Sequence, residues 1–272
     1  MTNKQWQAFC DFKEIFKAKV EEWKASAPEL TELQREAAKA AKTPDYPFET
    51  SVVYNRDLDR LTKEDDIHLI VIGDNPGKDE QLAKNNRYLV GQAGKIADGF
   101  FKKNPELQTD FRKNVIILNK TPVHSAKTAQ LKKIMKDGGE KICLLVEESQ
   151  LWMAEQTAKL HCALVEGACG SAGGTSSAFP LPELWLVGYS ELKPKHFFVP
   201  YRDRLFSTYQ AQNSSVWNNV YVFQHFSMNR FTIDLGDFIE KNGAGVGTGG
   251  ESGSLLKNIH SLGELHKNEI FG

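Results

Sequence analysis

The chain has 272 residues, of which 40% are hydrophobic and 25% charged, which is the composition of an ordinary globular protein with a sizeable core. Its net charge of −1 excludes a globally basic surface that coats nucleic acid, but it leaves room for a local binding groove. We expect a cytoplasmic protein with no membrane partner, because the sequence shows no apolar run near the roughly 18 residues of a membrane span, no signal peptide, and scattered cysteines without a CxxC pair (Cys10, Cys143, Cys162, Cys169).

The first 60 residues predict a helical extension packed on the core. Residues 4–25 carry large apolar side chains at three- and four-residue spacings, which indicates an amphipathic helix: Trp6, Phe9, Phe12, Phe16, Val20 and Trp23. A second helix is expected over 30–42, ending before Pro44, and "TSVVYN" (50–55) is a weaker candidate for a short strand.

Residues 61–242 predict one α/β domain. Short apolar runs bounded by turn residues indicate buried strands, and four of them occur at 68–73, 114–119, 184–189 and 219–226. Helices are expected between them, at 95–103, 140–165 and 202–210. Strands that alternate with helices predict a parallel sheet sandwiched between helical layers.

Two Gly-rich segments interrupt this alternation. Residues 166–182 predict a Gly/Ser-rich connection, and residues 243–253 predict a loop before a final short helix, so that 243–272 completes the same domain. Gly245, Gly247 and Gly250 stand in GxGxxG register, but "DFIEKN" precedes them instead of a buried strand. We therefore expect no dinucleotide site here.

Polar loops follow three of the predicted strands. "GDNPG" (73–77) follows the first strand, "NKTPVHS" (119–125) the second and "HFSMNR" (225–230) the fourth. Open α/β sheets bind their ligands at the carboxyl ends of the strands, so these loops are the candidate site. His124, in the second of them, is expected to be a loop histidine.

Together these motifs resemble the uracil-DNA glycosylase superfamily. The first has the form G-x-[DN]-P-G/Y, matched here by Gly73, Asp74, Asn75, Pro76 and Gly77. Its Asn-Pro-Gly version is similar to that of the single-strand-selective and mismatch-specific branches, whereas another branch carries Asp-Pro-Tyr.

"RYLVGQAG" (87–94) resembles the "RPFVGxAG" segment of the thermophilic and bacterial iron–sulfur branch. Leu89 stands where that branch has the aromatic residue that stacks on the base, and Tyr88 lies beside it, so either is the candidate for stacking. The cysteines of the iron–sulfur branch are missing, so the resemblance implies no cluster.

The other two motifs are partial. "VIILN" resembles the segment ending in a base-reading asparagine, which falls on Asn119. In the last motif, usually H-P-S-P before an intercalating residue, His225 and Ser227 match while Phe226 and Met228 replace both prolines. The resemblance covers residues 67–235.

The resemblance implies a three-layer α/β/α sandwich with a four-stranded parallel sheet in the order 2-1-3-4. It implies a monomeric, monofunctional DNA glycosylase that hydrolyses the glycosidic bond of uracil, or of a related 5-substituted pyrimidine, in single- or double-stranded DNA. No metal or other cofactor is needed for that reaction.

Each motif residue then has an expected role. Asn75 holds the attacking water, His225 donates to the departing base, and Asp74 assists through its charge. The substrate-binding residues are expected to be Gly73, Pro76, Gly77, Tyr88, Leu89, Asn119, Ser227 and Asn229. Ser227 contacts a phosphate or only fixes its turn, and the sequence leaves both open.

Two other classes of protein remain to be weighed. An inactive or respecialised member of the superfamily keeps the pocket and binds a nucleotide, nucleic acid or protein. Altered prolines and the missing stacking aromatic favour that alternative. A small-molecule α/β hydrolase is disfavoured, because the chain has no GxSxG nucleophile turn.

Overall fold

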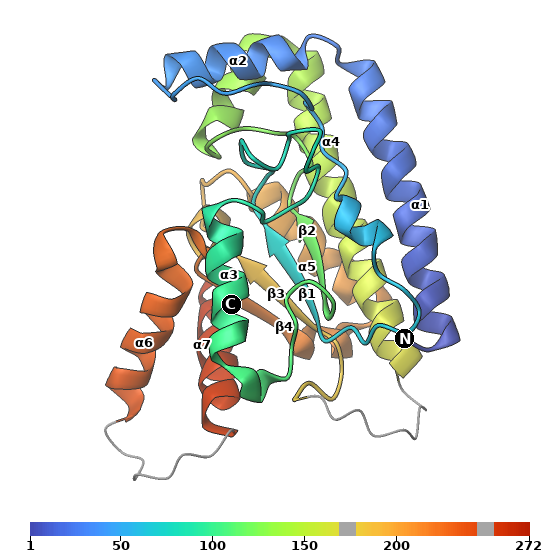
Figure 1. Ribbon diagram of the computed structural model, residues 1–272, viewed down its shortest axis with the longest axis vertical. Coiled ribbons are helices and arrows are strands. Elements are labelled where there is room, and N and C mark those ends of the chain that lie inside the picture. The colour runs from blue at the N-terminus through green and yellow to red at the C-terminus, as the bar shows by residue number, and fades with distance from the viewer. Residues whose placement is uncertain (169–177, 244–252) are drawn as a thin grey trace.

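The computed structural model describes residues 1–168, 178–243 and 253–272 (Figure 1). Four parallel strands form one sheet in the order β2-β1-β3-β4, which confirms the predicted topology. The strands are β1 (Leu69–Gly73), β2 (Val115–Asn119), β3 (Glu183–Val187) and β4 (Val220–Phe223). In β1, β2 and β3 every residue is buried, as expected for parallel strands covered on both faces.

Helices cover both faces of the sheet, so the predicted three-layer α/β/α sandwich is confirmed (Figure 1). On one side lie α3 (Gln92–Lys103), α6 (Arg230–Gly243) and α7 (Gly253–Phe271). On the other side lie α1 (Asn3–Ser26), α4 (Ala129–Ala168) and α5 (Val199–Gln212), and α2 (Leu30–Ala40) packs against α4. Short 3-10 helices complete the chain: η1 (Arg56–Asp59), η2 (Pro105–Leu107), η3 (Tyr189–Leu192), η4 (Ser214–Asn219) and η5 (Ser227–Asn229).

The first helix follows directly from its sequence. Thr2 caps it in a capping box, with its hydroxyl accepting from the Gln5 backbone at 3.2 Å. The predicted apolar face is buried against α4, where the ring of Phe16 stacks on that of Trp152 at 5.9 Å. Complete burial of such a side chain contributes about 1.5–3 kcal/mol, so this face fixes the helix to the core.

The remaining helices depart from the predictions in length and number. The helix predicted at 140–165 continues to Ala168 and is preceded by a second segment from Ala129, with a kink at Gly139 where φ is +68°. Helix α6 was not expected, and the final helix has 19 residues instead of being short. The region 50–55 forms only an isolated bridge, between Val52 and Val123.

Several sequence features fall outside the described residues. Most of the Gly/Ser-rich connection at 166–182 does so, as does the GxGxxG register of Gly245, Gly247 and Gly250. None of the helices in the described ranges is both long and apolar enough to cross a membrane.

Candidate functional site

The loops that follow β1, β2 and β4 meet at the carboxyl edge of the sheet and enclose a cleft of about 370 Å³. The cleft brings together Asn75, Asn119 and His225, which lie far apart in the sequence. Seven of the predicted site residues line it: Asp74, Asn75, Gly77, Leu89, Asn119, His225 and Ser227.

The other four predicted site residues lie outside the lining of the cleft. Gly73 ends β1 so close to Asn119 that a Cβ atom would stand 2.5 Å from the Asn119 Oδ1, which only glycine avoids. The carbonyl oxygen of Pro76 accepts from the Ser125 backbone N–H at 3.1 Å. Asn229 instead lines a neighbouring groove between α3 and α6. These positions shape or border the cleft without facing it.

Tyr88 is the clearest correction to the sequence prediction. Its ring is completely buried, and its hydroxyl donates to the Val53 carbonyl oxygen at 2.6 Å. Tyr88 therefore cannot stack on a base in the cleft, and of the two candidates only Leu89 reaches it. The tyrosine joins the N-terminal extension to the core.

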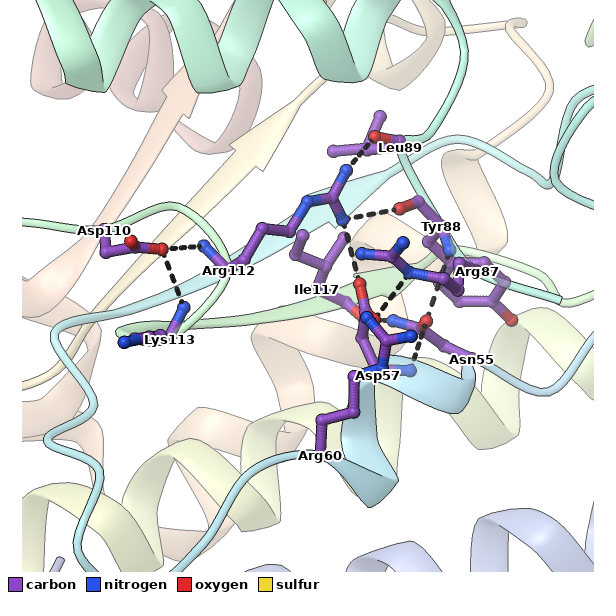
Figure 2. Close-up of polar contacts among 10 residues, drawn as sticks. All are labelled: Asn55, Asp57, Arg60, Arg87, Tyr88, Leu89, Asp110, Arg112, Lys113 and Ile117. Carbon is purple, nitrogen blue, oxygen red and sulfur yellow. Dashed lines mark hydrogen bonds and ion pairs between the residues drawn. The ribbon is translucent and has the colours of Figure 1, made fainter. Parts of the chain in front are cut away.

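Leu89 is held at the cleft by a network of charged side chains (Figure 2). Arg112 donates to the carbonyl oxygens of Tyr88 and Leu89, and it pairs with Asp57 of η1 at 3.0 Å. Asp57 also pairs with Arg87 at 2.6 Å. Leu89 has a φ of +51°, a strained conformation for a branched side chain, which this network stabilises.

The side-chain amide of Asn75 is fixed in one orientation. Its Nδ2 donates to the backbone oxygen and to the Oγ of Ser125, both at 3.0 Å, and its Oδ1 accepts from the Thr128 hydroxyl at 3.0 Å. An amide oxygen has two lone pairs, so one remains after the bond from Thr128. Asn75 can therefore accept a hydrogen bond from a water or ligand but has no free donor.

Asn119 presents the opposite case. It ends β2, is 2% exposed, and its buried Nδ2 has no hydrogen-bond partner among the described residues. A buried amide without a partner costs about 1–3 kcal/mol, so such groups call for a ligand or an ordered water. The Asn119 amide can therefore donate to a carbonyl oxygen placed in the cleft.

His225 is held in one tautomer by its own turn. The backbone N–H of Ser227 donates to the Nδ1 of His225 at 3.0 Å, so this nitrogen carries no proton and the neutral ring has its proton on Nε2. Burial lowers the pKa of His225, the Asp74 carboxylate raises it, and the Lys120 ammonium lowers it. The net shift is downward, so the ring is a neutral donor through Nε2.

Two charged residues of this region were missed by the sequence analysis. Glu80 lines the cleft, accepts from the Gly77 backbone N–H at 3.1 Å, and has its pKa raised to about 7 by burial. Lys120 follows Asn119 and pairs with Asp74 behind the cleft wall. Their positions three residues after Gly77 and one after Asn119 were the available signals, but neither spacing by itself indicates burial.

The described residues include no group of three or more His, Cys, Asp or Glu side chains that could hold a metal ion. No protein-family model matches the chain, and no characterised protein or solved structure matches it either.

Proposed function

We propose that this protein is a monofunctional DNA glycosylase that hydrolyses the glycosidic bond of uracil, or of a related 5-substituted pyrimidine, in DNA. The observation that carries the proposal is the meeting of Asn75, Asn119 and His225 in one cleft at the carboxyl ends of parallel strands. We propose the cytoplasm as its compartment, where the three cysteines of the described ranges keep free thiols.

Recognition of the base is assigned to Asn119. A base inside a duplex is out of reach, so it must first be flipped out, at a cost of a few kcal/mol. The unpartnered Nδ2 of Asn119 then donates to uracil O4, and its Oδ1 accepts from uracil N3–H. Cytosine reverses both polarities at this edge, and it leaves the buried asparagine groups unpaired.

Stabilisation of the leaving base is assigned to His225. Breaking the glycosidic bond leaves negative charge on the uracil, and the Nε2–H of the neutral ring donates to its O2. Because the Ser227 backbone already holds the ring through Nδ1, the donor is oriented before the reaction begins. Donors fixed where charge develops are among the largest contributions to catalysis.

Positioning of water is assigned to Asn75. Its Oδ1 keeps one acceptor site beside the cleft, which suits a water held beneath the sugar. An amide does not take up a proton as a carboxylate does, so this contribution is one of orientation. The carboxylate of Asp74, in the same loop, stabilises the positive charge that develops on the sugar.

A second candidate function is supported by what the cleft lacks. Among the described residues that line it, none is Phe, Tyr or Trp, and Leu89 offers only an aliphatic surface for a base. The net charge of −1 also provides little general attraction to DNA. An inactive or respecialised member of the superfamily would use the same cleft to bind a nucleotide, nucleic acid or protein without breaking a bond.

One experiment separates these functions. The protein is incubated with single- and double-stranded oligonucleotides that contain one uracil, and abasic sites are then cleaved with alkali. We expect strand cleavage with the wild type and with His196→Ala, an exposed histidine outside the cleft, and little with His225→Ala. Binding of the oligonucleotide without cleavage would support the second function instead.

A further inference from the structure

Lys120 is a completely buried lysine to which the reaction above gives no task. Its Nζ donates to the Asp74 Oδ1 at 2.5 Å and to the Val187 carbonyl oxygen at 2.5 Å, and it lies 5.0 Å from the centre of the Phe198 ring. Burying an ammonium group costs several kcal/mol before its partners offset that cost, and an apolar side chain fills such a space equally well. The charge of Lys120 is therefore expected to serve the site more than the fold.

The backbone after β3 is shaped around this ion pair. Gly188 has a φ of +92°, and a Cβ atom there would lie 2.4 Å from the Asp74 Oδ1 and 3.1 Å from the Lys120 Nζ. Only glycine allows both this conformation and this approach. The ends of β1, β2 and β3 thus close on the contact between Asp74 and Lys120.

His225 lies within the electrostatic reach of both charges. Asp74 favours the charged imidazolium, and Lys120 opposes it. Glu191 acts in turn on Lys120, while Glu80 and Lys127 are the other charged groups that line the cleft. Protonation at Nδ1 would place a proton against the Ser227 N–H that now donates to it, so the turn that orients the ring would have to open.

We propose that Lys120 is a positioning residue of the site: its buried ammonium neutralises Asp74 and thereby keeps the imidazole of His225 uncharged, with the Nε2–H directed to the substrate. The electrostatic part of this proposal is independent of the reaction, and its consequence for catalysis rests on the proposed function. An unpaired Asp74 would otherwise draw a proton onto the ring that has to donate as a neutral group.

The direct test is an NMR titration of the His225 ring in protein labelled at histidine, with its signal identified by its loss in His225→Gln. Lys120→Met keeps the bulk but removes the charge, and we expect it to raise the midpoint of His225 by about one pH unit or more. Lys120→Met combined with Asp74→Asn should return the midpoint to the wild-type value or below.

Asp74→Asn alone provides a second measurement should Lys120→Met fail to fold. It leaves the ammonium without its counter-ion, so the midpoint of His225 should fall below that of the wild type. An unchanged midpoint in Lys120→Met, or a rise in Asp74→Asn, would overturn the proposal.

The consequence for catalysis is read from the dependence of uracil excision on pH. In Lys120→Met the acid limb should move upward by the same interval as the NMR midpoint, with about a tenfold loss of rate for each unit on that limb. Equal rate losses at every pH would indicate a merely structural lysine. If the wild type excises no uracil, the proposed function fails while the titration still decides the role of Lys120.

Discussion

Gly77 offers the sharpest test of how the cleft selects its base. It lines the cleft, its N–H donates to Glu80 at 3.1 Å, and a Cβ atom built on it meets no atom within 4 Å. The backbone therefore admits a side chain at this position. In the Asp-Pro-Tyr branch that this chain resembles, a tyrosine at the corresponding position rejects the methyl group of thymine by its bulk. Gly77→Tyr would place the same barrier in this cleft.

The expected magnitudes follow from the open space at Gly77. An open or apolar pocket discriminates one methyl group by only about 1–3 kcal/mol, or roughly 10–200-fold, whereas a steric clash discriminates more strongly. The wild type should therefore process 5-hydroxymethyluracil at a rate comparable with that of uracil. Gly77→Tyr should reduce excision of the substituted base by more than about 100-fold while changing uracil excision much less.

The assay is single-turnover excision from matched oligonucleotides that carry uracil, 5-hydroxymethyluracil or cytosine. Gly77→Ala is the control, because its methyl group occupies open space and should leave the ratio of the two rates unchanged. Cytosine should be excised by none of the variants. A wild type that already rejects every 5-substituted uracil, or a tyrosine variant that slows both bases equally, would refute the assignment of Gly77.

Three further predictions concern single side chains of the cleft. His225→Ala should reduce single-turnover excision by about 10²–10³-fold, the cost of one donor to a developing oxyanion; a loss below tenfold would contradict its role. Asn75→Ala should slow the same step while a gel-shift titration shows nearly unchanged binding to uracil-containing DNA, and a parallel loss of binding would make Asn75 structural. Because burial raises the pKa of Glu80 from 4.5 to about 7, the folded protein holds a proton there that the unfolded chain releases, so the free energy of unfolding should fall as pH rises through this window, by about 3 kcal/mol in total. Urea unfolding at pH 5 and 8 should show a smaller fall in Glu80→Gln, and an identical fall would contradict this reasoning.

The sheet was predictable because its strands are short and apolar on both faces. The runs that became β1, β2 and β3 are buried at every residue, and such runs stand out between turn residues. The predicted fourth strand, 219–226, was too long, since β4 ends at Phe223 and the chain then turns towards the cleft. Apolar residues in that turn pack into the core, so hydrophobicity by itself does not mark the end of the strand.

Helix boundaries and partners were less predictable, because tertiary contacts determine them. Helix α6 follows a turn in which Met228 and Asn229 both have positive φ, and no local pattern signals that turn. Tyr88 and Leu89 are adjacent and both apolar in part, and the network around Arg112 decides which one reaches the cleft. Lys120 looks like a surface residue in the sequence, because its partner Asp74 lies 46 residues away.

The altered last motif has a physical explanation in the backbone of its turn. Met228 has a φ of +53°, which proline cannot adopt because its ring fixes φ near −65°. Phe226 has a φ of −66°, which proline would allow, but its ring is fully buried and packs on that of Phe231 with centroids 5.0 Å apart. An aromatic anchor in the core thus replaces the rigidity that prolines give to this motif in the proteins it resembles. The contact between the Ser227 N–H and the His225 Nδ1 is formed in this turn without either proline. The missing prolines are therefore a weaker argument against activity than the missing aromatic at Leu89, for which no neighbouring ring compensates among the described residues of the cleft.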